Sequence, residues 1–216
     1  MIPKLIHQIW VGEPPSEEIA FLMSTWHIVN PDFEIIVWDE EMLRKEFPDM
    51  PEKVWTYEPA MISDIFRVFI VYRYGGVYVD SDFEAVKPFN HIVETYKAFI
   101  GRPAKSPSHV ANGLFGAEIG SEFTERIRDS IIASDYNRYG HGPTFVSNML
   151  RREPHLCSKF LTHIFYPYYA GQPLPRKYED DTLACHHWNA SWLNRPELHK
   201  KFKDNVREVM KRWSTS

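Results

Sequence analysis

The sequence contains only two cysteines, Cys157 and Cys185, among its 216 residues. Two cysteines form no recognisable disulfide framework, so we expect reduced thiols in a reducing compartment. No stretch reaches the roughly 20 apolar residues that a membrane-spanning helix needs. Met1 leads directly into IPKLIHQIWV, without the basic segment and long apolar core of a signal peptide. These absences predict a soluble protein without a signal peptide or a transmembrane segment.

Neither sign of charge is in large excess. The chain has 25 Lys and Arg, 29 Asp and Glu, and a net charge of -4, which gives no case for nucleic-acid binding. Apolar residues make up 44% and aromatic residues 15% of the chain, enough for a sizeable core. The length suits one large domain or two small ones, and we expect a single domain over residues 1–216.

The expected elements alternate between strand and helix, which favours an α/β sheet flanked by helices. Apolar runs predict strands, and apolar spacing of three and four residues predicts helices. The best-defined helix has an apolar stripe of Met61, Ile65, Val68, Phe69 and Tyr72, and two glycines end it. The expected strands cover 4–11, 33–39, 77–86, 97–101, 113–119 and 182–192, and the expected helices 16–30, 40–47, 59–76, 122–134, 144–153 and 196–213.

The last predicted helix, at about 196–213, is amphipathic and basic. Residues 195–212 hold seven Lys or Arg and three Asp or Glu, a local charge of +4. This pattern favours a helix that docks on the domain with a solvated basic face. The alternative is a weak contact with a membrane surface.

The stretch GGVYVDSDFEAV, residues 75–86, places Asp80 and Asp82 one residue apart at the end of a buried strand. Side chains alternate along a strand, so we expect both carboxylates to point the same way. Two aspartates at a strand end are often only a solvated turn. Here they lie at the carboxyl end of a sheet strand, where open α/β sheets bind ligands, so we expect a divalent cation between them.

Two further groups of polar residues accompany this pair. Ser63, Asp64 and Arg67 share one face of the preceding helix, either as a simple ion pair or as ligands for sugar hydroxyls. Near the end of the chain, CHHWNASW presents His186 on one side of a strand and His187 on the other. We expect His186 to complete the metal site with the two aspartates.

These motifs together resemble glycosyltransferase family 32, which has a DXD sugar-binding region. The resemblance rests on S-D-x-x-R at 63–67, Y-G-G-V-Y-V-D-S-D at 74–82, I-H-Q-I-W near the start and H-H-W-N-A-S-W near the end. The string around the acidic pair is also similar to the glucosyltransferase domains of large clostridial toxins. The resemblance implies a GT-A fold, with one nucleotide-binding α/β domain, a mixed and mainly parallel sheet, and a site for Mn²⁺ or Mg²⁺.

The resemblance also implies roles for individual residues. Asp82 would bind the metal directly, Asp80 would contact it through water or hold the ribose, and His186 would be the late ligand, with His187 as the fallback. Trp10 would stack near the nucleotide base. The catalytic set would be Asp64, Arg67, Asp80 and Asp82, and the nucleotide and donor would contact Ile9, Trp10, Ser63, Asp64, Arg67, Tyr78, Asp80, Ser81, Asn112, Ser191 and Trp192.

Several positions in the middle of the chain are less well defined. Asn112 and Gly113 are expected on the sugar and acceptor side of the site, with Glu118 as a possible carboxylate nearby. His141-Gly142-Pro143-Thr144 fits the same region, although Pro143 is more typical of a helix N-terminus.

The expected activity is transfer of a hexose from a nucleotide diphosphate sugar to a hydroxyl of a saccharide or glycan acceptor. The resemblance implies retention of configuration, and inversion is the open alternative. A UDP-sugar is favoured, with GDP-mannose as the alternative donor. Because the chain shows no N-terminal anchor, we expect a cytoplasmic enzyme of a bacterium or a virus-infected host cell. Two other functions stay open, a nucleotide-sugar hydrolase and a non-catalytic carbohydrate-binding module.

Overall fold

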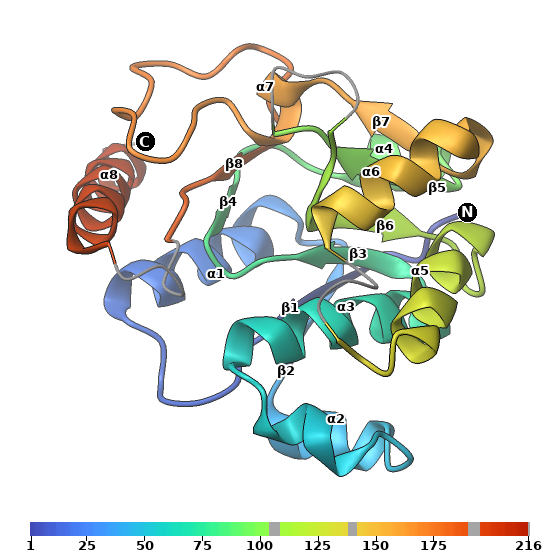
Figure 1. Ribbon diagram of the computed structural model, residues 1–216. Coiled ribbons are helices and arrows are strands. Elements are labelled where there is room, and N and C mark those ends of the chain that lie inside the picture. The colour runs from blue at the N-terminus through green and yellow to red at the C-terminus, as the bar shows by residue number, and fades with distance from the viewer. Residues whose placement is uncertain (104–108, 138–141, 190–194, 216) are drawn as a thin grey trace.

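The computed structural model describes residues 1–103, 109–137, 142–189 and 195–215. Its main feature is a six-stranded sheet with the order β2-β1-β3-β6-β5-β7 (Figure 1). β1 pairs in parallel with β2 and β3, β5 pairs in parallel with β7, and β6 is antiparallel to β3 and β5. The strands are β1 (Leu5–Ile9), β2 (Glu34–Trp38), β3 (Gly76–Val79), β5 (Ala98–Gly101), β6 (Ala111–Ala117) and β7 (Ser158–Phe160). The predicted mixed, mainly parallel sheet is confirmed.

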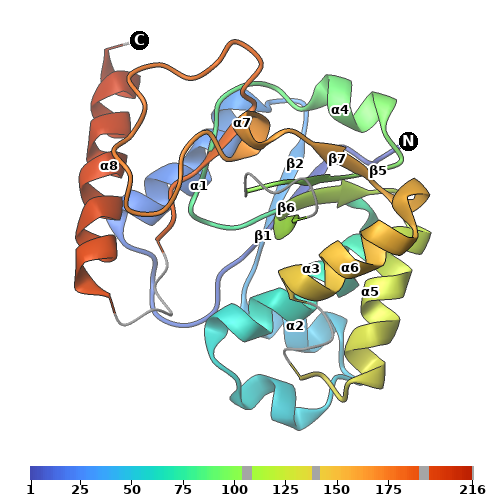
Figure 2. The ribbon, with the colours of Figure 1, turned by 45° about the horizontal axis from the view of Figure 1, so that its top comes forward.

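Helices cover both faces of this sheet (Figure 2). Alternation along β3 sends Tyr78 to one face, with α2, α3, α5 and α6, and Val77 and Val79 to the other, with α1, α4 and α7. The helices are α1 (Glu17–Val29), α2 (Glu40–Glu46), α3 (Pro59–Tyr74), α4 (Asn90–Thr95), α5 (Glu122–Ala133), α6 (Pro143–Arg152) and α7 (Thr162–Phe165), with short 3₁₀ turns at Glu52–Thr56 and Pro154–Leu156.

A second, two-stranded sheet extends beyond the end of β3. It pairs β4 (Phe83–Ala85) with β8 (Ala184–His186) in antiparallel register, so that Phe83 lies opposite His186. The expected strand over 77–86 is therefore wrong as one element, because a turn at 80–82 divides it into β3 and β4. The pairing of β8 with β4 brings His186 next to the acidic pair.

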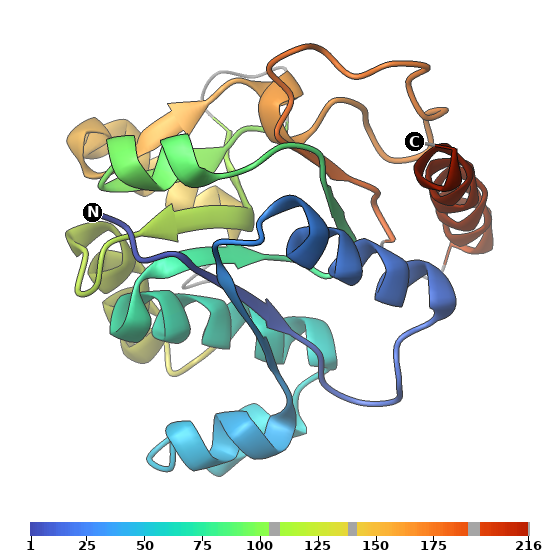
Figure 3. The same cartoon turned by 180° about the vertical axis from the view of Figure 1, so that it is seen from behind.

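The last helix, α8 (Pro196–Ser214), lies at the edge of the molecule beside α1 (Figure 3). Phe202 and Val206 of α8 pack with Ile19 and Leu22 of α1. This packing uses the apolar face of the helix and supports the prediction of a docked helix over a membrane contact. No helix in the described part of the chain is both long and apolar enough to span a bilayer.

The face that α3 buries differs from the predicted stripe. Ile65 and Val68 are buried, but Met61, Phe69 and Tyr72 are only half-buried. The additional buried residues are Ile62, Phe66, Ile70 and Val71. The helix packs against the sheet and also against α5 and the 3₁₀ turn at Glu52–Thr56, so more than one stripe is covered.

The turn from α3 into β3 explains the histidine of the I-H-Q-I-W motif. His7 is fully buried, with its Nε2 donating to the carbonyl of Gly75 at 2.9 Å and its Nδ1 accepting from Trp38 Nε1 at 3.2 Å. Burial lowers the pKa of His7 to about 4, so the ring is neutral. Gly75 and Gly76 have φ values of 63° and 92°, which residues with a Cβ atom rarely adopt.

We predict that Gly76→Ala lowers the free energy of unfolding by about 3 kcal/mol, because backbone strain adds to overpacking. A Cβ at this position would lie 2.7 Å from the carbonyl oxygen of Leu5. Urea unfolding measures the loss. Gly12→Ala is the control, since Gly12 has a φ of 105° but no atom within 4 Å of a Cβ, and should cost about 1 kcal/mol. Equal losses in the two variants would contradict the steric argument.

Candidate functional site

The acidic pair lies in the turn between β3 and β4. The amide of Phe83 donates to the carbonyl of Asp80 at 3.1 Å and closes this turn. Ligand atoms of Asp80, Asp82 and His186 all lie within 4.8 Å of one another. The two carboxylates therefore face the same place, as predicted, but the turn is responsible and not the alternation of a continuous strand.

Asp82 is the more deeply buried carboxylate, with 10% of its side chain exposed. Its Oδ1 lies 3.0 Å from His186 Nε2, and its Oδ2 accepts a hydrogen bond from the amide of Asn189 at 2.9 Å. Burial alone would raise the pKa of Asp82, but His186 and the amide of Asn189 together lower it below its usual value. Asp82 is therefore ionised at neutral pH.

His186 reaches Asp82 because β8 is paired with β4. Its ring stacks on Phe83, with ring centroids 4.4 Å apart and planes at 12°, and lies 4.2 Å from the ring of Trp188. These aromatic contacts fix the orientation of the imidazole. His187 points to the opposite side, where its Nε2 is 3.1 Å from Glu84, so it cannot serve as the fallback ligand.

The chain turns sharply after His187. Trp188 has a φ of 59°, an uncommon value for a bulky residue, and its Nε1 donates to the carbonyl of Tyr168 at 2.8 Å. This conformation directs the next amide, that of Asn189, toward Asp82. Strained backbone of this kind often occurs at functional sites.

Arg67 balances the second carboxylate. Its Nη2 lies 3.1 Å from Asp80 Oδ1 and 2.7 Å from Asp64 Oδ1, and only 7% of its side chain is exposed. The hydroxyl of Tyr78 donates to Asp80 at 2.7 Å and also lies 2.7 Å from Ser63 Oγ. The structure therefore brings these five predicted residues into one hydrogen-bonded group.

Asn112 and Gly113 border this group because β6 runs antiparallel beside β3. The carbonyl of Asn112 accepts from Arg67 Nη1 at 2.8 Å, and the carbonyl of Gly113 accepts from the amide of Asp80 at 2.7 Å. A Cβ on Gly113 would lie 2.6 Å from Asp80 Oδ2. The glycine thus leaves the space that the Asp80 carboxylate occupies.

The charges of this site are not fully compensated by the protein. Burial, with the negative charge of Asp82, raises the pKa of Asp80 to about 6 despite the opposing charge of Arg67. The two carboxylates of this ligand set suit Mn²⁺ or Mg²⁺, which prefer oxygen ligands, and one imidazole lies beside them. A divalent cation fits these residues, because it would neutralise the repulsion between the two aspartates.

Three other predicted residues, Ile9, Trp10 and Ser81, make no side-chain hydrogen bond or ion pair with the acidic pair within the described part of the chain. Ile9 is buried in the core, so its side chain is structural. Trp10 is half-buried against α1 and α8, and its Nε1 donates to the carbonyl of Glu13 at 2.7 Å. Ser81 is half-buried in the turn. The donor-binding roles given to these residues stay predictions, and Ser191, Trp192 and His141 lie outside the described residues.

Two expectations for the middle of the chain have clear outcomes. Glu118 follows β6, and the antiparallel pairing of Ala117 with Gly76 places it at the start of β3, away from the acidic pair. Its Oε1 contacts the N-terminal ammonium of Met1 instead. The expectation that it is near the site is wrong.

Pro143 is the first residue of α6, as its preference for helix N-termini predicts.

Sequence reasoning missed two residues of the site. Asn189 contributes only its backbone amide, which no side-chain pattern reveals. Tyr166 is buried, with its ring 5.5 Å from that of His186 and 5.4 Å from that of Phe83. The aromatic cluster FYPYY at 165–169 was the available signal, but its partners lie far away in the sequence.

Comparison with known families agrees with this geometry. Residues 16–99 match the family described as "Glycosyltransferase sugar-binding region containing DXD motif". This part of the chain is therefore similar to a DXD-type sugar-binding region. It contains Asp64, Arg67, Asp80 and Asp82, and the predicted family resemblance is confirmed.

Relatives extend the similarity beyond the sugar-binding region. The chain is 27% identical over 213 residues to inositol phosphoceramide mannosyltransferase 3 of Schizosaccharomyces pombe, covering 93% of this chain and 52% of that protein. The chain thus spans about half the length of this curated relative.

Solved structures similar to this chain are also glycosyltransferases. The PaToxG glycosyltransferase has a TM-score of 0.56 at 18% identity, covering 70% of each chain. The glycosyltransferase GlyE of Streptococcus pneumoniae has a TM-score of 0.55 at 14% identity, covering 97% of this chain and 64% of that one. At these identities the similarity shows the fold, which is of the GT-A type that the sequence predicted.

We predict that Asp80→Asn stabilises the metal-free protein at pH 7.5. The pKa of Asp80 in the folded state, about 6, lies above its ordinary value of 3.8, so its ionisation destabilises the fold as pH rises through this window. The side chain is 27% exposed, so we expect a gain of about 1–2 kcal/mol at pH 7.5 that shrinks toward pH 4.5. Urea unfolding in EDTA measures it, and a variant less stable at both pH values would contradict the prediction.

Proposed function

We propose that this protein is a metal-dependent glycosyltransferase that moves a hexose from a nucleotide diphosphate sugar to a hydroxyl of a saccharide or glycan acceptor. The observation that carries the proposal is the convergence of Asp80, Asp82 and His186 beside the Arg67–Asp64 pair. A binding module that needed no metal would gain nothing from holding two repelling carboxylates together.

Asp80, Asp82 and His186 would hold the cation, for which Mn²⁺ is the first candidate and Mg²⁺ the second. When bound, the metal supplies charge neutralisation for the departing diphosphate. The lowered pKa of Asp82 keeps its carboxylate ionised, as a cation requires, and the stacking of His186 on Phe83 holds the imidazole in one orientation.

The neighbouring residues would hold the donor sugar. Asp64 is bound to Arg67 through Oδ1 and has 41% of its side chain exposed, so its carboxylate can accept hydrogen bonds from sugar hydroxyls. Arg67 stays protonated, because Asp80 and Asp64 raise its pKa against the effect of burial. Its guanidinium lies 4.7 Å from the ring of Tyr78, which keeps it fixed beside Asp80.

Two kinds of nucleotide sugar are candidate donors. The motif around the acidic pair favours a UDP-sugar, whereas similarity to a protein named as a mannosyltransferase supports a mannosyl donor such as GDP-mannose. The name of that relative also makes an inositol-containing lipid a reasonable acceptor to test beside saccharides. Retention of anomeric configuration follows from the family resemblance, and proton NMR of the product distinguishes it from inversion.

A panel of UDP- and GDP-sugars with Mn²⁺, read out as nucleotide release, tests the proposal. Release should depend on the metal, stop with EDTA and accelerate when the correct acceptor is added. A nucleotide-sugar hydrolase would release nucleotide at the same rate with and without every acceptor. A carbohydrate-binding module would bind sugar without any donor turnover.

We predict that Asp82→Ala reduces Mn²⁺-dependent nucleotide release by about 100-fold or more, since loss of a direct ligand should exceed the loss caused by an outer-shell change. Asp129→Ala is the control, because Asp129 is an exposed residue of α5 that pairs with Arg128. Unchanged release in Asp82→Ala would remove the acidic pair from the mechanism.

Gly113→Ala tests the site without changing any polar group. The added methyl group would lie 2.6 Å from Asp80 Oδ2 and 3.2 Å from Phe83 Cε2, so the carboxylate must move. We expect Mn²⁺ affinity to fall by about tenfold or more, with a folded protein by circular dichroism. Wild-type affinity in the folded variant would show that the position of Asp80 is unimportant.

A further inference from the structure

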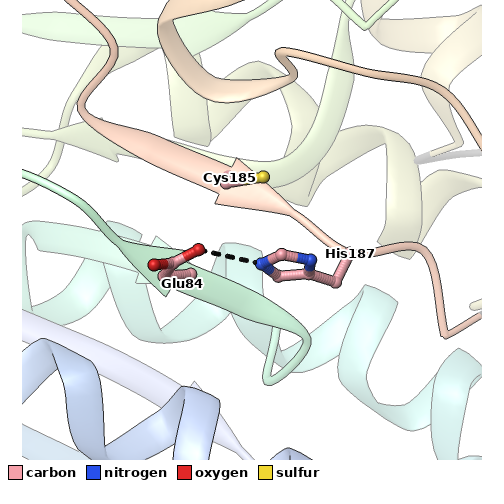
Figure 4. A group of neighbouring side chains, drawn as sticks. All are labelled: Glu84, Cys185 and His187. Atoms are coloured by element: carbon pink, nitrogen blue, oxygen red, sulfur yellow. Dashed lines mark hydrogen bonds and ion pairs between the residues drawn. The ribbon is translucent and has the colours of Figure 1, made fainter. Parts of the chain in front are cut away.

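A second polar cluster lies on the opposite face of the β4–β8 sheet from the metal site. Glu84, Cys185 and His187 are buried there, and their ligand atoms lie within 4.8 Å of one another (Figure 4). The Glu84 carboxylate already accepts three hydrogen bonds, from Trp213 Nε1 at 2.8 Å, the Tyr178 hydroxyl at 2.8 Å and His187 Nε2 at 3.1 Å. Donors on both oxygens compensate this buried charge, which argues against a second metal here.

The cluster holds His187 at both ring nitrogens. Because the Glu84 carboxylate is ionised and can only accept, His187 Nε2 carries the proton of the 3.1 Å contact. His187 Nδ1 lies 2.9 Å from the hydroxyl of Tyr168, which also accepts from Asn205 Nδ2 at 3.4 Å. The imidazole is therefore held in one orientation by Glu84 of β4 and by Tyr168. Asn205 of α8 in turn holds the hydroxyl of Tyr168.

The backbone of His187 is part of the metal site. Its amide donates to the carbonyl of Asp82 at 2.9 Å, and its neighbour in the chain is the ligand His186. Tyr168 acts on the same turn a second time, because its carbonyl accepts from Trp188 Nε1 at 2.8 Å. Fixing the His187 side chain on one face thus also fixes His186 and Asp82 on the other.

We infer that Glu84 is a positioning residue for the metal site. This inference rests on the proposed function. The Glu84–His187 contact holds the turn at 186–189 in the strained conformation that directs His186 and the amide of Asn189 toward Asp82. The indole of Trp213, near the end of α8, also donates to Glu84 and helps to hold this contact. Trp213 is 129 residues away from Glu84 in the sequence.

Direct Mn²⁺ binding, measured by electron paramagnetic resonance, tests this inference in the full chain. Glu84→Gln removes the charge that orients His187, and we expect Mn²⁺ affinity to fall by about 10- to 100-fold, as for other outer-shell changes. Activity at saturating Mn²⁺ should recover most of its wild-type value, so the loss appears in the metal concentration needed and not in kcat.

Tyr168→Phe is the second variant, in case Glu84→Gln does not fold. It removes only the hydroxyl that contacts His187 Nδ1 and keeps the carbonyl that holds Trp188. We expect about tenfold weaker Mn²⁺ binding, because one of the two contacts that orient the imidazole is lost. Wild-type affinity in this folded variant would overturn the inference.

Glu18→Gln is the matched control. Glu18 is a buried glutamate of α1 that also anchors α8, through an ion pair with Arg207 at 3.0 Å, but it has no contact with His187 among the described interactions. We expect unchanged Mn²⁺ affinity. Equal losses in Glu18→Gln and Glu84→Gln would show that docking of α8 matters and the Glu84–His187 contact does not. Absence of Mn²⁺ binding in the wild type would instead contradict the proposed function itself.

Discussion

The repulsion between Asp80 and Asp82 is the constraint on which the arrangement of this molecule depends. Two carboxylates beside each other at the end of a buried strand are unfavourable unless charge and hydrogen bonds compensate them. The protein supplies Arg67 and Tyr78 to Asp80, and His186 and the amide of Asn189 to Asp82. Burial and the charge of Asp82 still raise the pKa of Asp80 above its usual value, and a divalent cation beside the pair would oppose this effect.

The fold brings the surroundings of the acidic pair together from three distant parts of the chain. α3 carries Arg67 beneath the turn, β6 closes one side with Gly113, and β8 brings His186 back against β4. The two-stranded β4–β8 sheet matters most, because His186 points from one of its faces toward Asp82 and Glu84 points from the other toward His187. Packing behind the site and the arrangement of the site itself therefore depend on the same short sheet and the turns that adjoin it.

Local patterns in the sequence predicted much of this structure. The apolar spacing and the glycine stop predicted α3. The D-x-D spacing and S-D-x-x-R singled out Asp64, Arg67 and the acidic pair, which the structure brings together. Alternation along the late strand correctly separated His186 from His187. These signals work because helix and strand periodicity act over a few residues.

What the sequence did not predict depends on contacts between distant segments. The antiparallel direction of β6 decides that Gly113 and not Glu118 lies beside the acidic pair, and no local pattern encodes strand direction. The amide of Asn189 reaches Asp82 only because Trp188 has a positive φ that other segments hold.

Pulsed electron paramagnetic resonance of the protein with Mn²⁺ tests the central claim most directly. The account predicts one bound ion per chain with hyperfine coupling to one imidazole nitrogen, and loss of that coupling in His186→Ala. Bound Mn²⁺ without nitrogen coupling, or coupling that persists in His186→Ala, would contradict it.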